Sequence, residues 1–250
     1  MKQNIYDHPT FFKGYLELRD SGITYNDFLE QPAMKAEIPD LKGKRVLDLG
    51  CGTGVLSSYC VEKGCTSVDS VDISSKMIQR AEERNPHTKI NYICTPIEEF
   101  EGRDNAYDVI VSSLAIHYIA DYETLMKGLA DWLKEDGKLI FSIEHPVVTA
   151  RQEMNNWAKD ENGERLHWAL DDYHKEGRRE QHWFVDGVIK YHRTISTLIN
   201  GLTAAGFMIE KIVEPLPDQE GLEHLPNLAN EYRRPSFMII RSRKINQTQV

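Results

Sequence analysis

The sequence predicts an α/β fold in which helices cover a mostly parallel sheet. From residue 44 to about residue 145, short apolar runs of strand length alternate with helical segments, a pattern typical of a parallel sheet with crossover helices. A glycine-rich turn directly follows the first run, at the edge of the sheet where such folds bind ligands. The chain has 250 residues, 40% of them hydrophobic, which is enough for one large domain with a buried core.

The alternating region contains five expected strands, at 45–49, 67–73, 89–93, 107–112 and 137–144. Helices are expected between them at 54–63, 75–84 and 122–133, with a short turn at 97–100. A helix at 194–205, a strand at 207–213, a proline-rich loop and a last strand at 236–241 then return to the sheet. We therefore expect a single domain over residues 1–250, with right-handed crossovers that place the helices outside the sheet.

Two segments lie outside this alternation. Residues 1–42 are aromatic and polar and are interpreted as an N-terminal helical arm. Residues 146–193 are an insertion that carries three of the four tryptophans among many charged side chains. Within it, Asp186-Gly187 supplies the positive φ angles that a two-residue hairpin turn needs. We hypothesise that the insertion forms a substrate lid, and a satellite core or a dimer contact is the alternative.

Charge and cysteine usage exclude several classes of protein. Thirty Lys and Arg against 39 Asp and Glu give a net charge of -9, which argues against nucleic-acid and membrane partners. No signal-peptide pattern occurs at the N-terminus, and no stretch approaches the roughly 18 apolar residues of a membrane span, so we expect a cytoplasmic protein. The four cysteines lack the spacing of a zinc cluster or a disulfide framework, and no metal site is expected.

The glycine-rich turn is the strongest ligand signal. Gly50, Gly52 and Gly54 let the backbone turn sharply and approach a ligand closely. Dinucleotide sites use the spacing G-x-G-x-x-G, with a helix N-terminus facing the pyrophosphate, whereas this run reads G-x-G-x-G. Asp48 just before it would repel a pyrophosphate but could accept hydrogen bonds from an ammonium group. The spacing therefore favours S-adenosylmethionine (SAM) over a dinucleotide.

Asp72, at the end of the second expected strand, is the second signal. It lies 72 − 50 = 22 residues beyond Gly50, close to the roughly 20 expected for a carboxylate that binds both ribose hydroxyls. Asp69 is the weaker candidate for this role. The alternative is that Asp72 only caps the helix that follows.

Residues 44–145 resemble a class I SAM-dependent methyltransferase of the small-molecule "type 11" family. The motifs that carry the resemblance are, in order, VLDLGCGTG at 46–54, VDIS at 71–74, PIEEF at 96–100, YDVIVSSLAIHYI at 107–119 and LADWLKEDGKLIFSIEHP at 129–146. The likeness continues more weakly through 191–207 and 233–241. It implies a Rossmann-like sheet of seven strands, mostly parallel with the last strand antiparallel, flanked by helices.

The resemblance also implies which residues bind SAM and its product S-adenosylhomocysteine (SAH). The glycine turn would pass under the methionine part, Asp72 would hold the ribose, and the N-terminal arm would close over the cofactor. An ordinary surface role is the alternative for Arg19. The implied cofactor residues are Tyr15, Arg19, Asp48, Gly50, Cys51, Gly52, Gly54, Asp72, Ile73, Ile97, Glu98, Ser112 and Ser113.

Methyl transfer needs in-line alignment and, for some acceptors, removal of one proton. A histidine is the natural base near neutral pH, and the candidates are His117, His145 and His192, with Glu144 and Tyr191 nearby. A structural role is the alternative for His117, and a strand-ending turn for His145. Aromatic residues could wall a substrate pocket, and the candidates are Tyr118, Trp157, Tyr173, Trp183 and Tyr191.

We therefore expect an enzyme that methylates O, N or C of a small molecule, with a homodimer as the candidate assembly. A tRNA-modifying methyltransferase shares the fold, but it usually needs a basic face. An NAD-dependent dehydrogenase would also explain Gly50 and Asp72, although it fits the glycine spacing less well. A SAM-binding regulator without catalysis is the non-enzymatic alternative.

Overall fold

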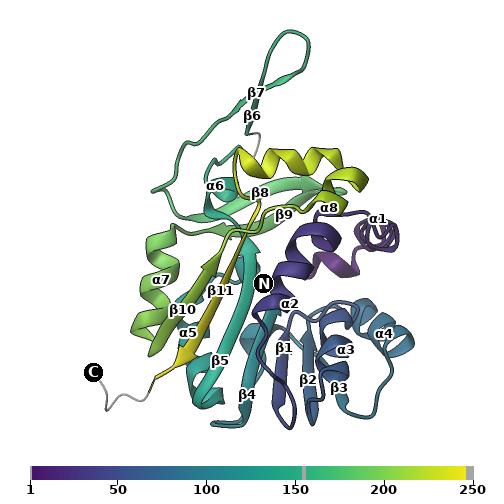
Figure 1. Ribbon diagram of the computed structural model, residues 1–250, viewed down its shortest axis with the longest axis vertical. Helices are drawn as coiled ribbons and strands as arrows, with labels where there is room; N and C mark the ends of the chain where they lie inside the picture. Colours follow the sequence, from purple (N-terminus) through teal and green to yellow (C-terminus); the bar gives the residue numbers. More distant parts are fainter. Residues whose placement is uncertain (1, 154–155, 246–250) are drawn as a thin grey trace.

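A computed structural model describes residues 2–153 and 156–245. Its centre is a seven-stranded sheet in the order β10-β11-β5-β4-β1-β2-β3 (Figure 1). Neighbouring strands are parallel except β11, which is antiparallel to both β5 and β10. This arrangement confirms the predicted fold class. The strands are β1 Arg45–Leu49, β2 Ser67–Asp72, β3 Ile90–Cys94, β4 Tyr107–Ser113, β5 Leu133–Glu144, β10 Phe207–Val213 and β11 Phe237–Lys244.

Both faces of the sheet are buried. Leu47 of β1 and Ile110 of β4 belong to one apolar cluster, whereas their sequence neighbours Val46 and Val109 belong to the other. This is the alternation that strand geometry dictates. The helices that follow the strands are α3 Val55–Glu62, α4 Ser75–Arg84, α5 Tyr122–Trp132 and α7 Ile195–Ala204. Hydroxyl or carboxylate caps begin three of them, since Ser74, Asp121 and Thr194 accept hydrogen bonds from backbone amides of α4, α5 and α7.

The N-terminal arm is helical, as expected, and crosses the end of the sheet where the parallel strands finish (Figure 1). It consists of η1 Ile5–Asp7, α1 Pro9–Asp20, a π-helical turn η2 Asn26–Glu30 and α2 Gln31–Glu37. Two contacts anchor it to α4. The Asp7 carboxylate accepts hydrogen bonds from Ser74 Oγ at 2.6 Å and from the amide of Lys76 at 3.2 Å, and Arg84 pairs with Asp20 through two hydrogen bonds.

The insertion contains a short helix and two hairpins. Strands β6 Trp157–Lys159 and β7 Arg165–Trp168 project from the top of the molecule, and β8 Gly177–Trp183 with β9 Val185–His192 lies over the sheet (Figure 1). Helix α6 Pro146–Thr149 precedes them. The second hairpin was predicted, but its turn was placed wrongly. The chain reverses at Phe184, which has a φ of +58°, whereas Gly187 lies inside β9.

Packing against the arm explains the displaced turn. The Phe184 ring lies so close to Gly14 of α1 that a Cβ there would come within 2.6 Å of it. Trp183 and Phe184 both contact the ring of Phe11, with centroids 5.2 and 5.6 Å apart. A second local difference lies after β10, where the expected loop contains α8 Gln219–His224 and η5 Pro226–Tyr232.

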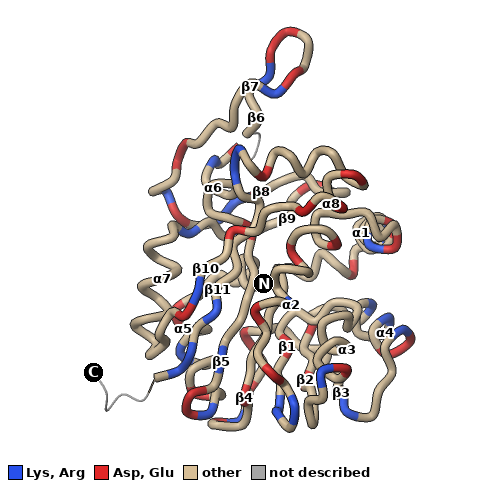
Figure 2. The backbone as a smooth tube through the Cα atoms, viewed as in Figure 1, with Lys and Arg blue, Asp and Glu red and all other residues tan. Residues whose placement is uncertain are grey.

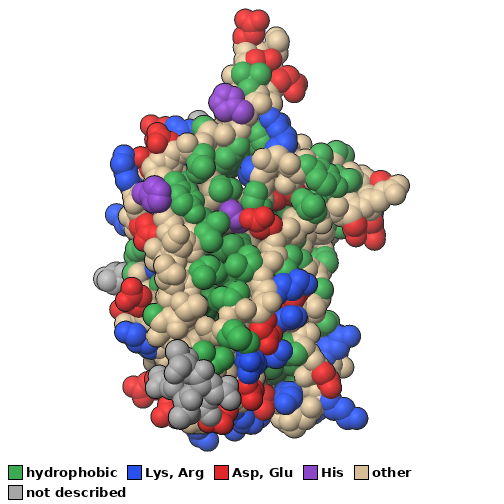
Figure 3. Space-filling model, turned by 60° about the vertical axis from the view of Figure 1, so that its left-hand side comes forward, with side chains coloured by type: hydrophobic (Ala, Val, Ile, Leu, Met, Phe, Trp, Pro, Cys, Tyr) green, Lys and Arg blue, Asp and Glu red, His purple; other side chains and the backbone are tan. Residues whose placement is uncertain are grey.

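Strand β10 forms one edge of the sheet. Figure 3 turns the side with α7 and β10 forward and shows hydrophobic side chains along it, and Met208 and Ile212 of β10 are exposed. Nothing in the structure tests the expected homodimer, which stays a prediction. No helix within the described ranges is both long and apolar enough to cross a membrane.

Candidate active site

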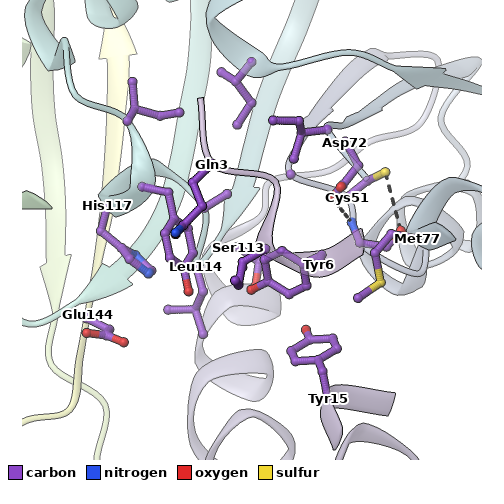
Figure 4. A pocket seen from close by; sticks show the side chains of 18 of the residues that line it. Gln3, Tyr6, Tyr15, Cys51, Asp72, Met77, Ser113, Leu114, His117 and Glu144 are labelled. Atoms are coloured by element: carbon purple, nitrogen blue, oxygen red, sulfur yellow. Dashed lines mark hydrogen bonds between the residues drawn. The ribbon is translucent and has the colours of Figure 1, made fainter. Parts of the chain in front are cut away.

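A cavity of about 680 Å³ opens at the carboxyl ends of the parallel strands. Its wall is formed by the turn after β1, the ends of β2, β4 and β5, the start of the antiparallel strand β11, the N-terminal arm and the β8–β9 hairpin. In Figure 4, Asp72, Cys51 and Met77 lie on one side of the cavity, and His117 and Glu144 lie on the other. We call these two sides the glycine-turn end and the histidine end.

The glycine turn requires its glycines. Gly50 and Gly52 have φ angles of +75° and +53°. Residues other than glycine rarely adopt this region of backbone conformation. A Cβ on Gly50 would lie 2.3 Å from the Cβ of Ala115, whereas no atom lies within 4 Å of one built on Gly52. Both glycines line the cavity, so the turn presents backbone rather than side chain to a ligand.

Two buried carboxyl groups lie beside this turn. Asp48 accepts a hydrogen bond from Ser57 Oγ at 2.6 Å, and burial raises its pKa to about 7. Asp72 accepts from the amide of Gly52 at 2.9 Å and from the amide of Ser74 at 2.8 Å, and burial raises its pKa to about 6. The N-cap of α4 is Ser74, so Asp72 supports that cap and also faces the cavity.

Most of the expected cofactor residues lie on the cavity wall. Those are Tyr15, Arg19, Asp48, Gly50, Cys51, Gly52, Asp72, Ile73, Ile97, Glu98 and Ser113. Gly54 and Ser112 are not among the residues that line it. A Cβ on Gly54 would come within 2.4 Å of the Tyr92 hydroxyl, and the buried Ser112 donates its hydroxyl proton to the Leu49 carbonyl at 2.7 Å. Gly54 and Ser112 therefore have structural roles beside the site: Gly54 allows close packing of Tyr92, and Ser112 links β4 to β1.

The histidine end contains a buried charge pair. Lys190 of β9 donates to both carboxylate oxygens of Glu144, at 2.7 and 2.5 Å, and its positive charge keeps the pKa of Glu144 below its usual value despite burial. His117 of η4 Ile116–Tyr118 is 5% exposed. Burial is the main cause that lowers its pKa to about 4, so its imidazole is neutral at physiological pH.

The other two candidate histidines do not line the cavity. His145 is buried, with Nε2 at 2.9 Å from a Glu214 oxygen and Nδ1 accepting the amide proton of Val147. His192 is buried between Thr149 Oγ1 and the Tyr173 carbonyl, at 2.8 and 2.9 Å. Both nitrogens of each ring already have partners within the protein.

The expected substrate residues divide in the same way. Tyr118, Trp183 and Tyr191 line the cavity, whereas Trp157 and Tyr173 do not. Trp157 packs edge-on against Trp168, and the guanidinium of Arg233 lies 4.6 Å from its ring centroid. The Tyr173 hydroxyl accepts the amide proton of Ile195 at 3.0 Å. These contacts lie within the insertion and its neighbours and not on the cavity wall.

The first residues of the chain were missed as cavity residues. Residues 2–7, which we call the strap, cross the cavity between three elements. Lys2 pairs with Glu99 at 3.0 Å. The Gln3 side chain binds β9 like an added strand, donating to the Gly187 carbonyl at 2.6 Å and accepting from the Ile189 amide at 2.8 Å. No sequence pattern predicts that a single glutamine such as Gln3 binds a hairpin, which is why this contact was not predicted.

A buried network at the junction of the arm and the sheet was also missed. The Glu30 carboxylate accepts from Ser142 Oγ at 2.5 Å and from Ser113 Oγ at 2.9 Å. Gln31 donates its amide protons to Glu30 and to Ser113, at 2.9 and 3.0 Å, which leaves its Oε1 buried without a partner at the cavity wall. An unpartnered acceptor at a ligand cavity indicates a ligand that brings a hydrogen-bond donor.

The chain matches known methyltransferases. The family model "Methyltransferase domain" matches residues 47–141. An uncharacterized protein from Haemophilus influenzae is 37% identical over 98% of this chain and 99% of its own. The crystal structure of an S-adenosylmethionine-dependent methyltransferase from Mesorhizobium loti is 36% identical, with a TM-score of 0.80 over 86% of this chain and 97% of its own.

A more distant relative is the ubiquinone biosynthesis O-methyltransferase of Neisseria meningitidis. It is 30% identical over 107 residues, which are 41% of this chain and 45% of that protein. This chain therefore aligns with less than half of that relative.

The chain belongs to the class I SAM-dependent methyltransferases, as its motif order predicted. It is an enzyme of that class, and its cofactor is SAM. The cavity fits this cofactor, because the glycine turn exposes backbone, Asp48 and Gln31 Oε1 offer acceptors to an ammonium group, and Asp72 offers one to hydroxyls. Membership in this class removes the dehydrogenase alternative.

Proposed function

We propose that the protein transfers the methyl group of SAM to a small-molecule acceptor bound at the histidine end of the cavity. The observation that carries this proposal is the division of one cavity into two chemically different ends. The glycine-turn end has carboxylates and exposed backbone, and the histidine end has a neutral imidazole, a charge pair and aromatic walls. A donor and an acceptor can therefore lie side by side, as in-line transfer requires.

The residues at the glycine-turn end would hold the donor. Asp72 would bind the ribose hydroxyls, Ile73 and Ile97 would pack on the adenine, and Asp48 with Gln31 would accept hydrogen bonds from the methionine ammonium group. When bound, SAM supplies a sulfonium-activated methyl group. The protein then has to align the acceptor, exclude water and take up any proton that is released.

The cover of the cavity supports a small acceptor. The strap and the β8–β9 hairpin meet over it, with Tyr6 and Trp183 both within about 6 Å of the Tyr15 ring. We assign residues 1–42 and the β8–β9 part of residues 146–193 the role of a lid. The projecting hairpin β6–β7 lies outside that role.

Charge also supports a small acceptor over tRNA. Among the described residues, the cavity wall has two side chains of Lys or Arg, and both are paired: Lys2 with Glu99, and Arg19 with Asp27 at 3.8 Å. Lys and Arg alternate with Asp and Glu around the molecule in the view of Figure 2. A tRNA acceptor would need unpaired cations near the site to bind the phosphate backbone.

The partial relative in ubiquinone biosynthesis supports an oxygen acceptor in a small molecule. Its name describes methylation of oxygen. Because the alignment covers under half of each chain, it supports the class of acceptor and not a particular substrate.

Methyl-labelled SAM tests this proposal. We expect label to pass to compounds in the low-mass fraction of a bacterial extract and not to bulk tRNA, with SAH formed in parallel. Transfer to tRNA with none to the low-mass fraction would overturn it.

The cofactor assignment is tested by titration with SAH. Asp72→Asn should weaken binding roughly 10- to 100-fold, the scale of lost charge-assisted hydrogen bonds. Asp69→Asn is the control, because Asp69 lies on the same strand but binds Tyr107 and Asn91 and does not line the cavity. Equal affinities in both variants would refute the ribose assignment.

A further inference from the structure

The histidine end has features that restrict which acceptor it can bind. Resting on the proposed function, we infer that the acceptor is an uncharged molecule with a hydroxyl group on a planar ring. His117 is the catalytic base that takes the hydroxyl proton, and Glu144 with Lys190 are positioning residues that orient the imidazole. The inference stands on the two cavities beside His117, on the paired charges around it and on the aromatic walls.

His117 lies between two cavities. Its ring lines the large cavity and also a second cavity of about 10 Å³ behind it, which is roughly the space of one water molecule. Glu144, Thr149, Tyr191 and Arg193 line the small cavity as well. His117 Nδ1 is buried without a hydrogen-bond partner. Although Ile116, Ile143, Pro146 and Leu198 also line it, a pocket of this size has room for one water that bridges a buried nitrogen and a carboxylate.

The small cavity determines the state of the imidazole. A water in this cavity that binds the Glu144 carboxylate would accept the proton of Nδ1, and Nδ1 would then carry the hydrogen of the neutral ring. Nε2 is then left unprotonated and faces the large cavity, where it can accept a proton. The Lys190 ammonium group holds Glu144 in place through both carboxylate oxygens. Removal of either charge would loosen the bridge to His117.

Paired charges at this end exclude charged acceptors. A phosphate or carboxylate would find no free cation in the described part of the wall, since Lys190 is paired with Glu144, and Arg193 donates to the carbonyls of Ile119 and Ala120 at 2.5 and 2.9 Å. An ammonium group would need a carboxylate whose charge is not already balanced, but Lys190 balances the charge of Glu144. Asp121, which also lines the cavity, caps α5 by accepting from the Thr124 amide. The acceptor that fits is therefore neutral.

Aromatic side chains define the shape of the acceptor. Tyr118, Trp183, Tyr191 and Phe237 line the large cavity together with Ile119 and Ile189. The Tyr118 ring centroid lies 4.4 Å from that of His117. Walls of flat rings bind planar rings best, because they offer stacked and edge-on contacts over a large area.

The proposed step balances as follows. The acceptor oxygen gives its proton to His117 Nε2 and forms a bond to the methyl carbon, while the carbon–sulfur bond breaks with its electron pair on sulfur. The imidazolium that forms is stabilised by the Glu144 carboxylate and releases its proton to solvent once the product leaves. A weakly basic imidazole suits this step, because the hydroxyl becomes strongly acidic as the new bond forms. The same imidazole is too weak a base to deprotonate an alkylammonium group.

The test uses protein with ¹⁵N-labelled histidines, saturated with SAH, and nuclear magnetic resonance of the imidazole nitrogens. His117→Gln assigns the signals by their loss. We expect wild-type His117 to be neutral with hydrogen on Nδ1 from pH 8 down to about pH 5. Glu144→Gln should remove this preference for Nδ1, and Lys190→Arg should keep it. Hydrogen on Nε2 in the wild-type protein would overturn the inference.

Three simple probes then test the acceptor class on the same samples. Phenol should shift the Nε2 signal of His117, whereas benzylammonium and benzoate at equal concentration should not. A larger response to either charged probe would refute the neutral acceptor. SAH binding is measured in parallel, so a protein that binds SAH but fails these tests rejects this inference alone, and loss of SAH binding rejects the proposed function as well.

Kinetics with an acceptor found in the low-mass fraction complete the test. His117→Gln should lower kcat about 100-fold or more with SAH affinity unchanged. Glu144→Gln should alter the acidic limb of the pH profile of kcat. Lys190→Arg keeps the positive charge and should keep most of the wild-type rate. An unchanged rate in His117→Gln would show that His117 is not the base.

Discussion

The two ends of the cavity are built in different ways. The glycine-turn end takes Asp48, Gly50, Gly52 and Asp72 from two adjacent parallel strands and the turns that follow them. The histidine end brings together His117, Glu144 and Lys190 from three elements, and the Glu144–Lys190 pair alone spans 46 residues of sequence. A site built from neighbouring turns repeats as a motif, whereas one built across an insertion can differ from one relative to the next.

This comparison predicts that changes at the two ends affect different measurements. The largest effect should come from Lys190→Met, which leaves the Glu144 carboxylate unpaired. The unfolding free energy should fall by about 3 kcal/mol, while SAH affinity stays unchanged because the glycine-turn end is intact. Denaturant unfolding and SAH titration check this.

The control for Lys190→Met is the double variant Glu144→Gln, Lys190→Met, which removes both charges. It should recover a large part of the lost stability, because no unpaired charge remains. A double variant less stable than Lys190→Met would contradict the assigned ion pair. A large loss of SAH affinity in Lys190→Met would show that the two ends are not independent.

Gly50→Ala should have the opposite signature. Its Cβ overlaps that of Ala115 at a positive φ, so the turn or η4 has to move. We expect SAH binding to weaken by about 100-fold, or about 2.7 kcal/mol. Gly43→Ala is the matched control, since Gly43 has a φ of +74° but open space around its Cβ. It should lose only the backbone term of roughly 1–2 kcal/mol in stability and bind SAH normally.

A smaller effect is expected from pH. The pKa values of about 7 for Asp48 and about 6 for Asp72 are both raised by burial, and hydrogen bonds donated by the ligand favour the ionised forms without requiring them. SAH affinity should therefore fall roughly tenfold between pH 8 and pH 5.5 as these groups take up protons. Titrations in a series of buffers measure this. Asp48→Asn should flatten the part of the profile above pH 6.5, and an unchanged profile would rule out Asp48 as the group that titrates.

The same two carboxyl groups affect stability in a defined direction. Their folded pKa values lie above the unfolded value of 3.8, so between about pH 4 and pH 7 the folded protein holds protons that the unfolded chain has lost. Their contribution to the unfolding free energy therefore decreases as the pH rises through that window.

The sequence predicts the glycine-turn end of the cavity better than the histidine end. The strands and the glycine-turn end were predictable because strand, turn and helix follow one another within about 30 residues, and each step has a local cause. Asp72 was found by its distance from Gly50. Gly54 and Ser112 belong to the same motif, but a motif does not distinguish a residue that faces the ligand from one that supports the turn.

The candidate residues that do not line the cavity share a physical feature. Trp157, Tyr173, His145 and His192 look like site residues by type, yet each has partners that only the folded chain brings close, such as Arg233 beside Trp157 and Glu214 beside His145. The hairpin turns at Phe184 and not at the predicted Asp186-Gly187, because Gly14, far away in sequence, leaves room for the Phe184 ring. Such long-range packing carries no local signal in the sequence.

The hydrogen bonds between the Gln3 side chain and β9 give one backbone amide of β9 an unusual partner. The Ile189 amide proton is held by a side chain of the strap instead of a strand partner, while its neighbours on β9 are held by β8. Its exchange with heavy water therefore follows the detachment of the strap and not the opening of the hairpin. This amide is a built-in reporter of how often the cavity opens, and it can be followed without knowing the methyl acceptor.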